Sequence, residues 1–283
     1  MKKIAFLISG NIRIYEKNLV FFEEIKKILK DFEIIIVSSI WENQEDLENF
    51  KEKYKIKFIK KIKQKNWNDK INAVKFVTGE ENLSWKIENV FHMWHSIVEN
   101  VHFLEKINSE NNLNIDYVCR FRTDIINLKS IENLKNDLID LENEEFLISS
   151  NRHFKGITDL FFIAKYQTFL KLKNIFSFFD KFSQENRVFN PEYIFYCFLS
   201  ESKFRIKIAH KFNLALIRME EAKPTKRVYV PLKDKINMKM IALTNMILKF
   251  TVTSLRHSWC SFCTVNNCFW IFSIWCLRDK KFS

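Results

Sequence analysis

The residues best suited to chemistry lie in the stretch DYVCRFRTDIINL, residues 116–128. Alternate side chains of an extended chain point to the same face, so the spacing predicts Arg120, Arg122 and Asp124 together on one face of a strand. The opposite face is apolar and typical of a core. Charges that leave water are costly unless they are paired or bound to a ligand. The stretch is therefore either an edge strand stabilised by an internal Arg–Asp ion-pair network, or one wall of a charged site.

A second candidate segment follows the first apolar run. Residues 3–9, KIAFLIS, predict a buried strand that ends at Gly10, so SGNIR, residues 9–13, lies where a strand becomes a loop. Gly10 allows a close backbone approach, and the guanidinium of Arg13 suits a phosphate or a carboxylate. The ordinary alternative is a solvated Arg13 and a simple chain turn. With only three glycines, the sequence has neither a Walker loop nor a GxGxxG fingerprint, which excludes the common nucleotide-binding classes.

Two further carboxylates are candidate general bases. Asp159 follows the tripeptide GIT and precedes the apolar run LFFIA, so we expect it to project from the mouth of a strand; a turn-capping Asp is the alternative. Glu192 follows Pro191, which is typical of the first turn of a helix, where the helix dipole favours an acid without any catalytic role. Asp159 is the preferred candidate of the two.

The elements expected around these candidates alternate between strand and helix. Apolar, β-branched runs predict strands, and apolar residues at spacings of three and four predict helices. This alternation indicates an α/β fold with a largely parallel central sheet in the first half of the chain. Such sheets bind ligands beyond the carboxyl ends of their strands, where SGNIR and Asp124 fall. The expected strands are 3–9, 33–41, 55–63, 116–128, 145–150 and 159–165, and the expected helices are 15–30, 84–107, 166–182 and 191–201.

The composition is that of a folded protein with excess positive charge. Hydrophobic residues make up 47% and aromatic residues 15%, which argues against disorder, while the formal net charge is +12. The lysine-rich run at 51–65 is interpreted as a solvated face, with a phosphate-binding patch as the alternative. The sequence shows no nucleic-acid-binding motif, so we expect no nucleic acid partner. Since no signal peptide is recognisable, we expect a cytoplasmic body with reduced thiols.

Histidine and cysteine give weaker signals. His92 and His95 share a helix face, but their aromatic neighbours favour helix packing over metal binding. Four of the six cysteines fall in the last 24 residues with a single CxxC pair, which is weak evidence for zinc. Cys119 and Cys197 are expected to be core thiols.

The end of the chain differs from the rest. Residues 219–283 contain eleven Lys and Arg against four Asp and Glu, and no charged residue occurs between Arg256 and Arg278. That uncharged gap has the length of a membrane span, but its polar residues and aromatic cluster favour an interfacial anchor on anionic lipid. The abrupt change in composition also fits a frameshifted end. We therefore expect a body at 1–222 and a basic, aromatic, membrane-associating tail at 223–283.

Five segments together carry a resemblance to a known family. FLISGNIR, VSSIW, YVCRFRTDI, GITDLFFIAKYQTF and NPEYIF occur in that order within residues 3–200. The series resembles WavE-type lipopolysaccharide synthesis proteins and related bacterial glycosyltransferases. The resemblance implies a type A glycosyltransferase fold, Rossmann-like, with a mostly parallel mixed sheet flanked by helices. It also implies a nucleotide-sugar donor and a divalent ion, Mn²⁺ or Mg²⁺, on an Asp-x-Asp motif. Here Arg122-Thr123-Asp124 stands in that place and keeps one carboxylate, so Asp124 is the expected metal ligand.

The residues and the resemblance together predict a hexosyltransferase-like enzyme. It would act peripherally at the inner face of the cytoplasmic membrane and transfer a sugar to a lipid-linked oligosaccharide of lipooligosaccharide, lipopolysaccharide or capsule. A catalytically silent scaffold of the same pathway is the alternative. Asp159 and Glu192 are the expected catalytic residues. The donor-binding residues are expected to be Ser9, Gly10, Asn11, Arg13, Arg120, Arg122 and Asp124.

Overall fold

The computed structural model divides the chain into two compact units, Met1–Met219 and Glu220–Ser283. Arg13 and the whole second unit lie outside the described residues, so the tail and the expected boundary at 222 stay predictions. In the described part of the chain, no helix has both the length and the apolar character that a membrane span requires. The structure describes residues 1–12, 14–73, 87–127, 131–149, 156–184, 191–209, 212 and 214–216.

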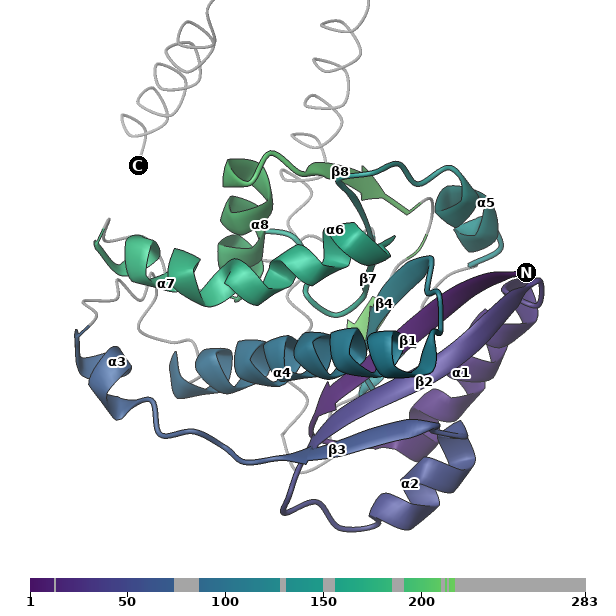
Figure 1. Ribbon diagram of the computed structural model, residues 1–283, viewed down its shortest axis with the longest axis horizontal. Coiled ribbons are helices and arrows are strands. Elements are labelled where there is room, and N and C mark those ends of the chain that lie inside the picture. The colour runs from purple at the N-terminus through teal and green to yellow at the C-terminus, as the bar shows by residue number, and fades with distance from the viewer. Residues whose placement is uncertain are drawn as a thin grey trace, which may run out of the picture. The chain divides into compact units, whose positions relative to one another are not determined.

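Within the described residues, a seven-stranded mixed sheet forms the centre of the first unit (Figure 1). Its order is β3-β2-β1-β4-β7-β6-β8, and the first four strands are parallel. β7 is antiparallel to both of its neighbours, and β8 is parallel to β6. The predicted α/β class with a mostly parallel mixed sheet is confirmed. The strands are β1 Lys2–Gly10, β2 Phe32–Trp41, β3 Phe58–Ile62, β4 Tyr117–Phe121, β6 Glu145–Ile148, β7 Phe162–Lys165 and β8 Arg205–Ile208.

Helices cover both faces of this sheet. The sequence predicted α1, α4 and α8, while the expected helix at 166–182 is broken into α6, a 3-10 turn η1, and α7. Three short helices, α2, α3 and α5, were not predicted. The helices are α1 Tyr15–Ile28, α2 Leu47–Tyr54, α3 Asn68–Ala73, α4 Ile87–Asn111, α5 Leu134–Ile139, α6 Tyr166–Leu170, η1 Lys171–Asn174, α7 Ile175–Gln184 and α8 Pro191–Glu201.

The alternation of β1 divides the core into two layers. Ala5 and Leu7 belong to the cluster that contains the buried face of α4, whereas Phe6 and Ile8 belong to the cluster that contains α1. Figure 1 shows α4 lying across one face of the sheet and α1 lying on the other. Because both faces are covered, the central strands are mostly apolar, and Ser38, Ser39 and Arg120 are buried exceptions. A polar side chain on these strands therefore has to find a partner inside the protein or at a strand end.

The stretch at 116–128 is not one strand, and the prediction of a single strand there was wrong. β4 ends at Phe121, a turn follows, and β5 (Ile125–Asn127) pairs antiparallel with β9 (Leu214–Leu216) in a separate two-stranded sheet. The edge-strand interpretation was also wrong, because β4 lies between β1 and β7. Of the three charged residues, Arg120 alone lies within a strand. Arg122 and Asp124 lie in the turn beyond its carboxyl end.

The two cysteines in the described part of the chain are free thiols within the core. Cys119 and Cys197 are both buried, as predicted. Burial raises the pKa of the Cys119 thiol well above its usual value, although Arg120 beside it acts in the opposite direction. A thiol held in its neutral form is a poor nucleophile, so Cys119 is a packing residue.

Candidate active site

A pocket of about 490 Å³ lies where β1, β2 and β4 end. Parallel strands bring their carboxyl ends to one edge of a sheet, and Gly10, Trp41 and Arg122 lie at or just beyond those ends. Except for Arg13, which is outside the described residues, every site residue that the sequence predicted lines this pocket. These residues are Ser9, Gly10, Asn11, Arg120, Arg122, Asp124, Asp159 and Glu192.

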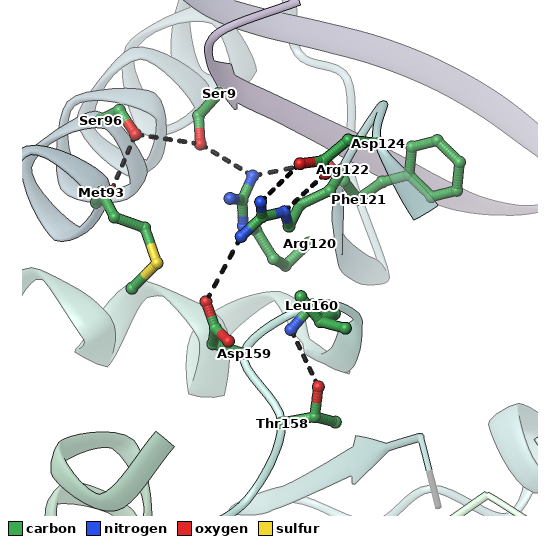
Figure 2. A network of polar contacts seen from close by, with 10 residues as sticks. All are labelled: Ser9, Met93, Ser96, Arg120, Phe121, Arg122, Asp124, Thr158, Asp159 and Leu160. Atoms are coloured by element: carbon green, nitrogen blue, oxygen red, sulfur yellow. Dashed lines mark hydrogen bonds and ion pairs between the residues drawn. The ribbon is translucent and has the colours of Figure 1, made fainter. Parts of the chain in front are cut away.

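Arg120 is a buried cation that lines the pocket, and Figure 2 shows its contact with Ser9. Only 3% of the residue is exposed. Nη1 donates to Ser9 Oγ at 2.8 Å and to the Phe121 carbonyl at 3.3 Å, while Nε is buried with no hydrogen-bond partner in the described part of the protein. Burial, followed by Arg122, lowers the pKa of Arg120 to about 10, so it is still protonated at neutral pH. A buried charge with a spare donor is a candidate contact for an anion.

The end of β1 holds Arg120 in place and keeps α4 close. Ser96 Oγ of α4 lies 3.4 Å from Ser9 Oγ, the acceptor for Arg120. Gly10 has a φ of +85°, a conformation that residues with a Cβ rarely adopt. A Cβ there would also lie 3.4 Å from Ser96 Oγ and 3.5 Å from Trp41 Nε1. The positive φ therefore favours glycine at this strand end, and the expected close approach of a ligand to Gly10 stays a prediction.

Arg122 forms ion pairs with two carboxylates. Its Nε donates to Asp124 Oδ1 at 2.8 Å and its Nη2 to Asp124 Oδ2 at 2.7 Å, while Nη1 lies 3.8 Å from Asp159 Oδ2 (Figure 2). Burial opposes ionisation of both partners. The carboxylates outweigh it and raise the pKa of Arg122, and Arg122 in turn lowers the pKa of Asp124. The bidentate fork is the strong form of an Arg–carboxylate pair, so it fixes the orientation of Asp124.

The expected metal role of Asp124 fits this geometry poorly. Both carboxylate oxygens already accept hydrogen bonds from Arg122, so a divalent ion would have to bind beside the positive charge of that guanidinium. Among the residues that the structure describes, no group of three or more His, Cys, Asp and Glu side chains could hold a metal ion. The metal role therefore stays a prediction, and no step below depends on it.

The two predicted bases reach the pocket from different elements. Asp159 lies in the segment before β7 and is 3% exposed, whereas Glu192 lies in the first turn of α8. Both line the pocket together with Asp124. Asp159 reaches the pocket because β7 is antiparallel to β4. The start of β7, and the segment before it, therefore lie beside the carboxyl end of β4.

An aromatic and amide-rich part of the lining was not predicted. Trp41 ends β2 and contacts the ring of His92 at a centroid distance of 5.8 Å. His95 is 3% exposed and packs between Trp41 and Trp67, at 6.0 Å and 5.6 Å, so it is a packing residue as expected. A tryptophan at a strand end, in VSSIW, was the available sequence signal. The other unpredicted lining residues include Gln64, Asn89, Met93 and Ser96.

Comparison with known proteins finds only remote similarity. No family model matches the chain, and no curated protein matches it. Among solved structures, it is similar to the galactosyltransferase LgtC in complex with donor and acceptor sugar analogs (10% identity, TM-score 0.40, 73% of this chain and 72% of that one). It is also similar to a glycosyltransferase involved in glycosylation of the major capsid of PBCV-1 (10%, 0.36, 72% and 81%). A third is mouse xyloside xylosyltransferase 1 (9%, 0.39, 74% and 85%). Similarity this remote does not establish an activity, and the WavE-type resemblance stays a prediction.

Proposed function

We propose that the protein is a glycosyltransferase that transfers a sugar from a nucleotide-sugar donor to an acceptor hydroxyl. The observation that carries the proposal is Arg120, a buried cation with a spare donor in the same pocket as Asp124, Asp159 and Glu192. Sugar transfer develops negative charge on the leaving phosphate and needs a carboxylate to accept the proton of the acceptor hydroxyl. One pocket at the ends of parallel strands contains side chains for both tasks.

The geometry supports a division of labour between the two arginines. Arg120, held by Ser9, binds the donor phosphate, and Gly10 and Asn11 bring the backbone close to it. Arg122 orients Asp124 toward the sugar instead of binding the phosphate, because its fork already holds that carboxylate. Asp159 acts as the base, with Glu192 as the alternative. Arg13 would add a second phosphate contact.

The acceptor and the location of the enzyme are part of the same proposal. We propose a lipid-linked surface glycan as the acceptor, reached at the inner leaflet of the cytoplasmic membrane. The support is the basic and aromatic composition of residues 223–283, which suits a segment lying on anionic lipid.

A catalytically silent scaffold is the second candidate. The observation that favours it is the bidentate Arg122–Asp124 pair, which satisfies both charges internally without a ligand. In that case, the pair would contribute mainly to stability. About a quarter of each side chain of the pair is exposed, so replacing one partner should cost less than the about 3–5 kcal/mol of a fully buried pair.

The test is thermal unfolding of the full chain with UDP-, GDP- and CMP-sugars, with and without Mn²⁺, alongside an assay of donor consumption. A donor at 100 times its dissociation constant stabilises the protein by about 2.7 kcal/mol. Arg120→Lys replaces the planar guanidinium with a point charge. We therefore expect the apparent affinity for the donor, obtained from the donor-induced thermal shift, to fall at least about tenfold. Arg205→Lys is the matched control, because Arg205 pairs with Glu142 on the surface, away from the pocket.

Asp124→Asn separates the two candidates. For the enzyme, we expect donor consumption to fall about 100-fold or more in protein that still binds the donor and unfolds cooperatively. The Arg122–Asp124 pair is lost in either case, so some loss of stability is expected for both candidates. For the scaffold, we expect no selective shift with any nucleotide sugar in the wild-type protein. A selective wild-type shift that survives in Arg120→Lys would contradict the phosphate-binding role of Arg120.

A further inference from the structure

The segment at 156–160 is locked to the first turn of α8 by backbone contacts. Ile157 N donates to the Glu192 carbonyl at 3.2 Å. A Cβ on Gly156 would lie 2.2 Å from Glu192 C, 2.3 Å from Glu192 O and 2.5 Å from Tyr193 N. Those are backbone atoms that no rotamer change can move aside, so any residue other than glycine must separate the segment from the helix.

The same segment has a second internal restraint on Asp159. Thr158 is fully buried, and its Oγ1 accepts a hydrogen bond from Leu160 N at 3.2 Å (Figure 2). A hydroxyl that bonds the backbone two residues on closes a small turn. Asp159 is the residue enclosed by that turn, so the turn restrains its backbone. Its Oδ2 lies 3.8 Å from Arg122 Nη1.

We propose that Gly156 and Thr158 are positioning residues that set the Asp159 and Glu192 carboxylates relative to one another. The inference rests on the proposed function and deepens it, because it assigns the geometry of the acceptor side of the pocket to two residues that touch no substrate. The segment that carries Asp159 is fastened to the backbone of Glu192 itself, so a shift of one carboxylate shifts the pair. A misplacement of about 1 Å at a reacting group can cost about 100-fold in rate.

The hydrogen bonds that hold Arg120 come from elements other than the 156–160 segment, although the charge of Asp159 acts on both arginines. Arg120 and Ser9 lie on β4 and β1, and their contacts to Phe121 and Ser96 involve no atom of the 156–160 segment. A small displacement of that segment therefore changes how the base meets the acceptor and leaves the phosphate contact in place. The expected signature is a fall in kcat without a matching change in the donor KM.

The experiment compares Thr158→Val with Thr168→Val in the full chain. Thr168 is 4% exposed, and its Oγ1 accepts a hydrogen bond from Glu144 N at 3.1 Å, outside the pocket. Each substitution replaces a buried hydroxyl with a methyl group and leaves one backbone amide without its acceptor. We expect kcat to fall about tenfold in Thr158→Val, with the donor KM within about twofold of wild type, and neither constant to change in Thr168→Val. Steady-state donor consumption and donor-induced thermal stabilisation provide the readouts.

Gly156→Ala is the more severe variant, with an expected loss in kcat of about 100-fold. If this variant fails to fold, the comparison of Thr158→Val with Thr168→Val tests the inference. Equal kcat values in Thr158→Val and Thr168→Val would overturn the inference, as would a change in donor KM as large as the change in kcat. A wild-type protein that neither binds nor consumes any nucleotide sugar would overturn the proposed function, and with it this inference, before any variant is compared.

Discussion

Arg120 and Arg122 are two positions apart but have opposite electrostatic surroundings. Burial and a neighbouring arginine lower the pKa of Arg120 to about 10, whereas the carboxylates of Asp124 and Asp159 outweigh burial at Arg122. The prediction from the sequence did not distinguish the two arginines, because their spacing showed only that they could share a face. The difference in their surroundings depends on the turn after Phe121, which brings the Asp124 carboxylate into hydrogen-bond contact with Arg122. No local pattern in the sequence encodes that reversal.

His95 gives the clearest prediction of pH dependence. Burial, followed by Lys65, lowers its pKa below the ordinary 6.5, while Glu99 acts in the opposite direction. The folded protein therefore binds this proton less readily than the unfolded chain. The contribution to stability is complete above about pH 6.5 and is lost as the pH falls from there toward the lowered folded-state pKa. We expect the free energy of unfolding to fall by up to about 1.4 kcal/mol per pH unit in that range.

Urea unfolding at pH 7.5 and 5.5 checks this expectation. His95→Gln should remove the histidine component and flatten the difference between the two pH values. His102→Gln, on an exposed position of the same helix, should leave the difference as it is in wild type. If the two variants respond alike, His95 is not the group responsible.

Long elements were predictable and short ones were not. β1 and β2 contain unbroken apolar runs at 4–8 and 34–37, and α4 repeats its apolar face over 25 residues, so their patterns outweigh local exceptions. α5 has 6 residues and β8 has 4, too few for a period to be visible. The break between β4 and β5 was missed for another reason, since Arg122-Thr123-Asp124 keeps the alternation that a strand would have. Pairing with β9 far along the chain ends the strand there.

Asn18 of α1 forms a buried hydrogen bond to the backbone of β5. It is fully buried, its Nδ2 donates to the Ile125 carbonyl, and its Oδ1 accepts from Tyr54 OH at 2.8 Å. Asn18→Leu keeps the approximate volume but removes the donor, so we expect it to destabilise the protein by about 2 kcal/mol. Asn111→Leu is the matched control, because Asn111 Nδ2 donates to the Ile107 carbonyl at an exposed position; its effect should stay within about 0.5 kcal/mol.

Chemical denaturation of both variants gives the comparison. Since Ile125 directly follows Asp124, Asn18→Leu should also reduce donor consumption by more than its effect on the folded fraction. Similar losses of stability in both asparagine variants would mean that the bond to Ile125 contributes no more than a surface hydrogen bond.

At the scale of the whole molecule, the prediction concerns the two units. We expect the full chain to co-sediment with anionic lipid vesicles and a chain ending at Met219 to bind them at least about tenfold more weakly. The interaction should weaken with added salt, because screening shortens the range of the lysine and arginine charges. Neutral vesicles are the control. Equal binding by both chains would locate the lipid contact in residues 1–219, where the lysine-rich run at 51–65 would be the first region to examine.

The contact between Ser9 and Arg120 joins positions 111 residues apart, and this separation has a consequence for synthesis of the protein. At ribosomal speeds of about 5–20 residues per second, β1 emerges roughly 6–20 s before β4. During that interval β1 can pair with β2 on one side, while its other edge exposes unpaired amides and an apolar surface that invite association with other chains. Yield of folded protein should therefore depend on translation rate and on chaperones that shield β1 until β4 has emerged.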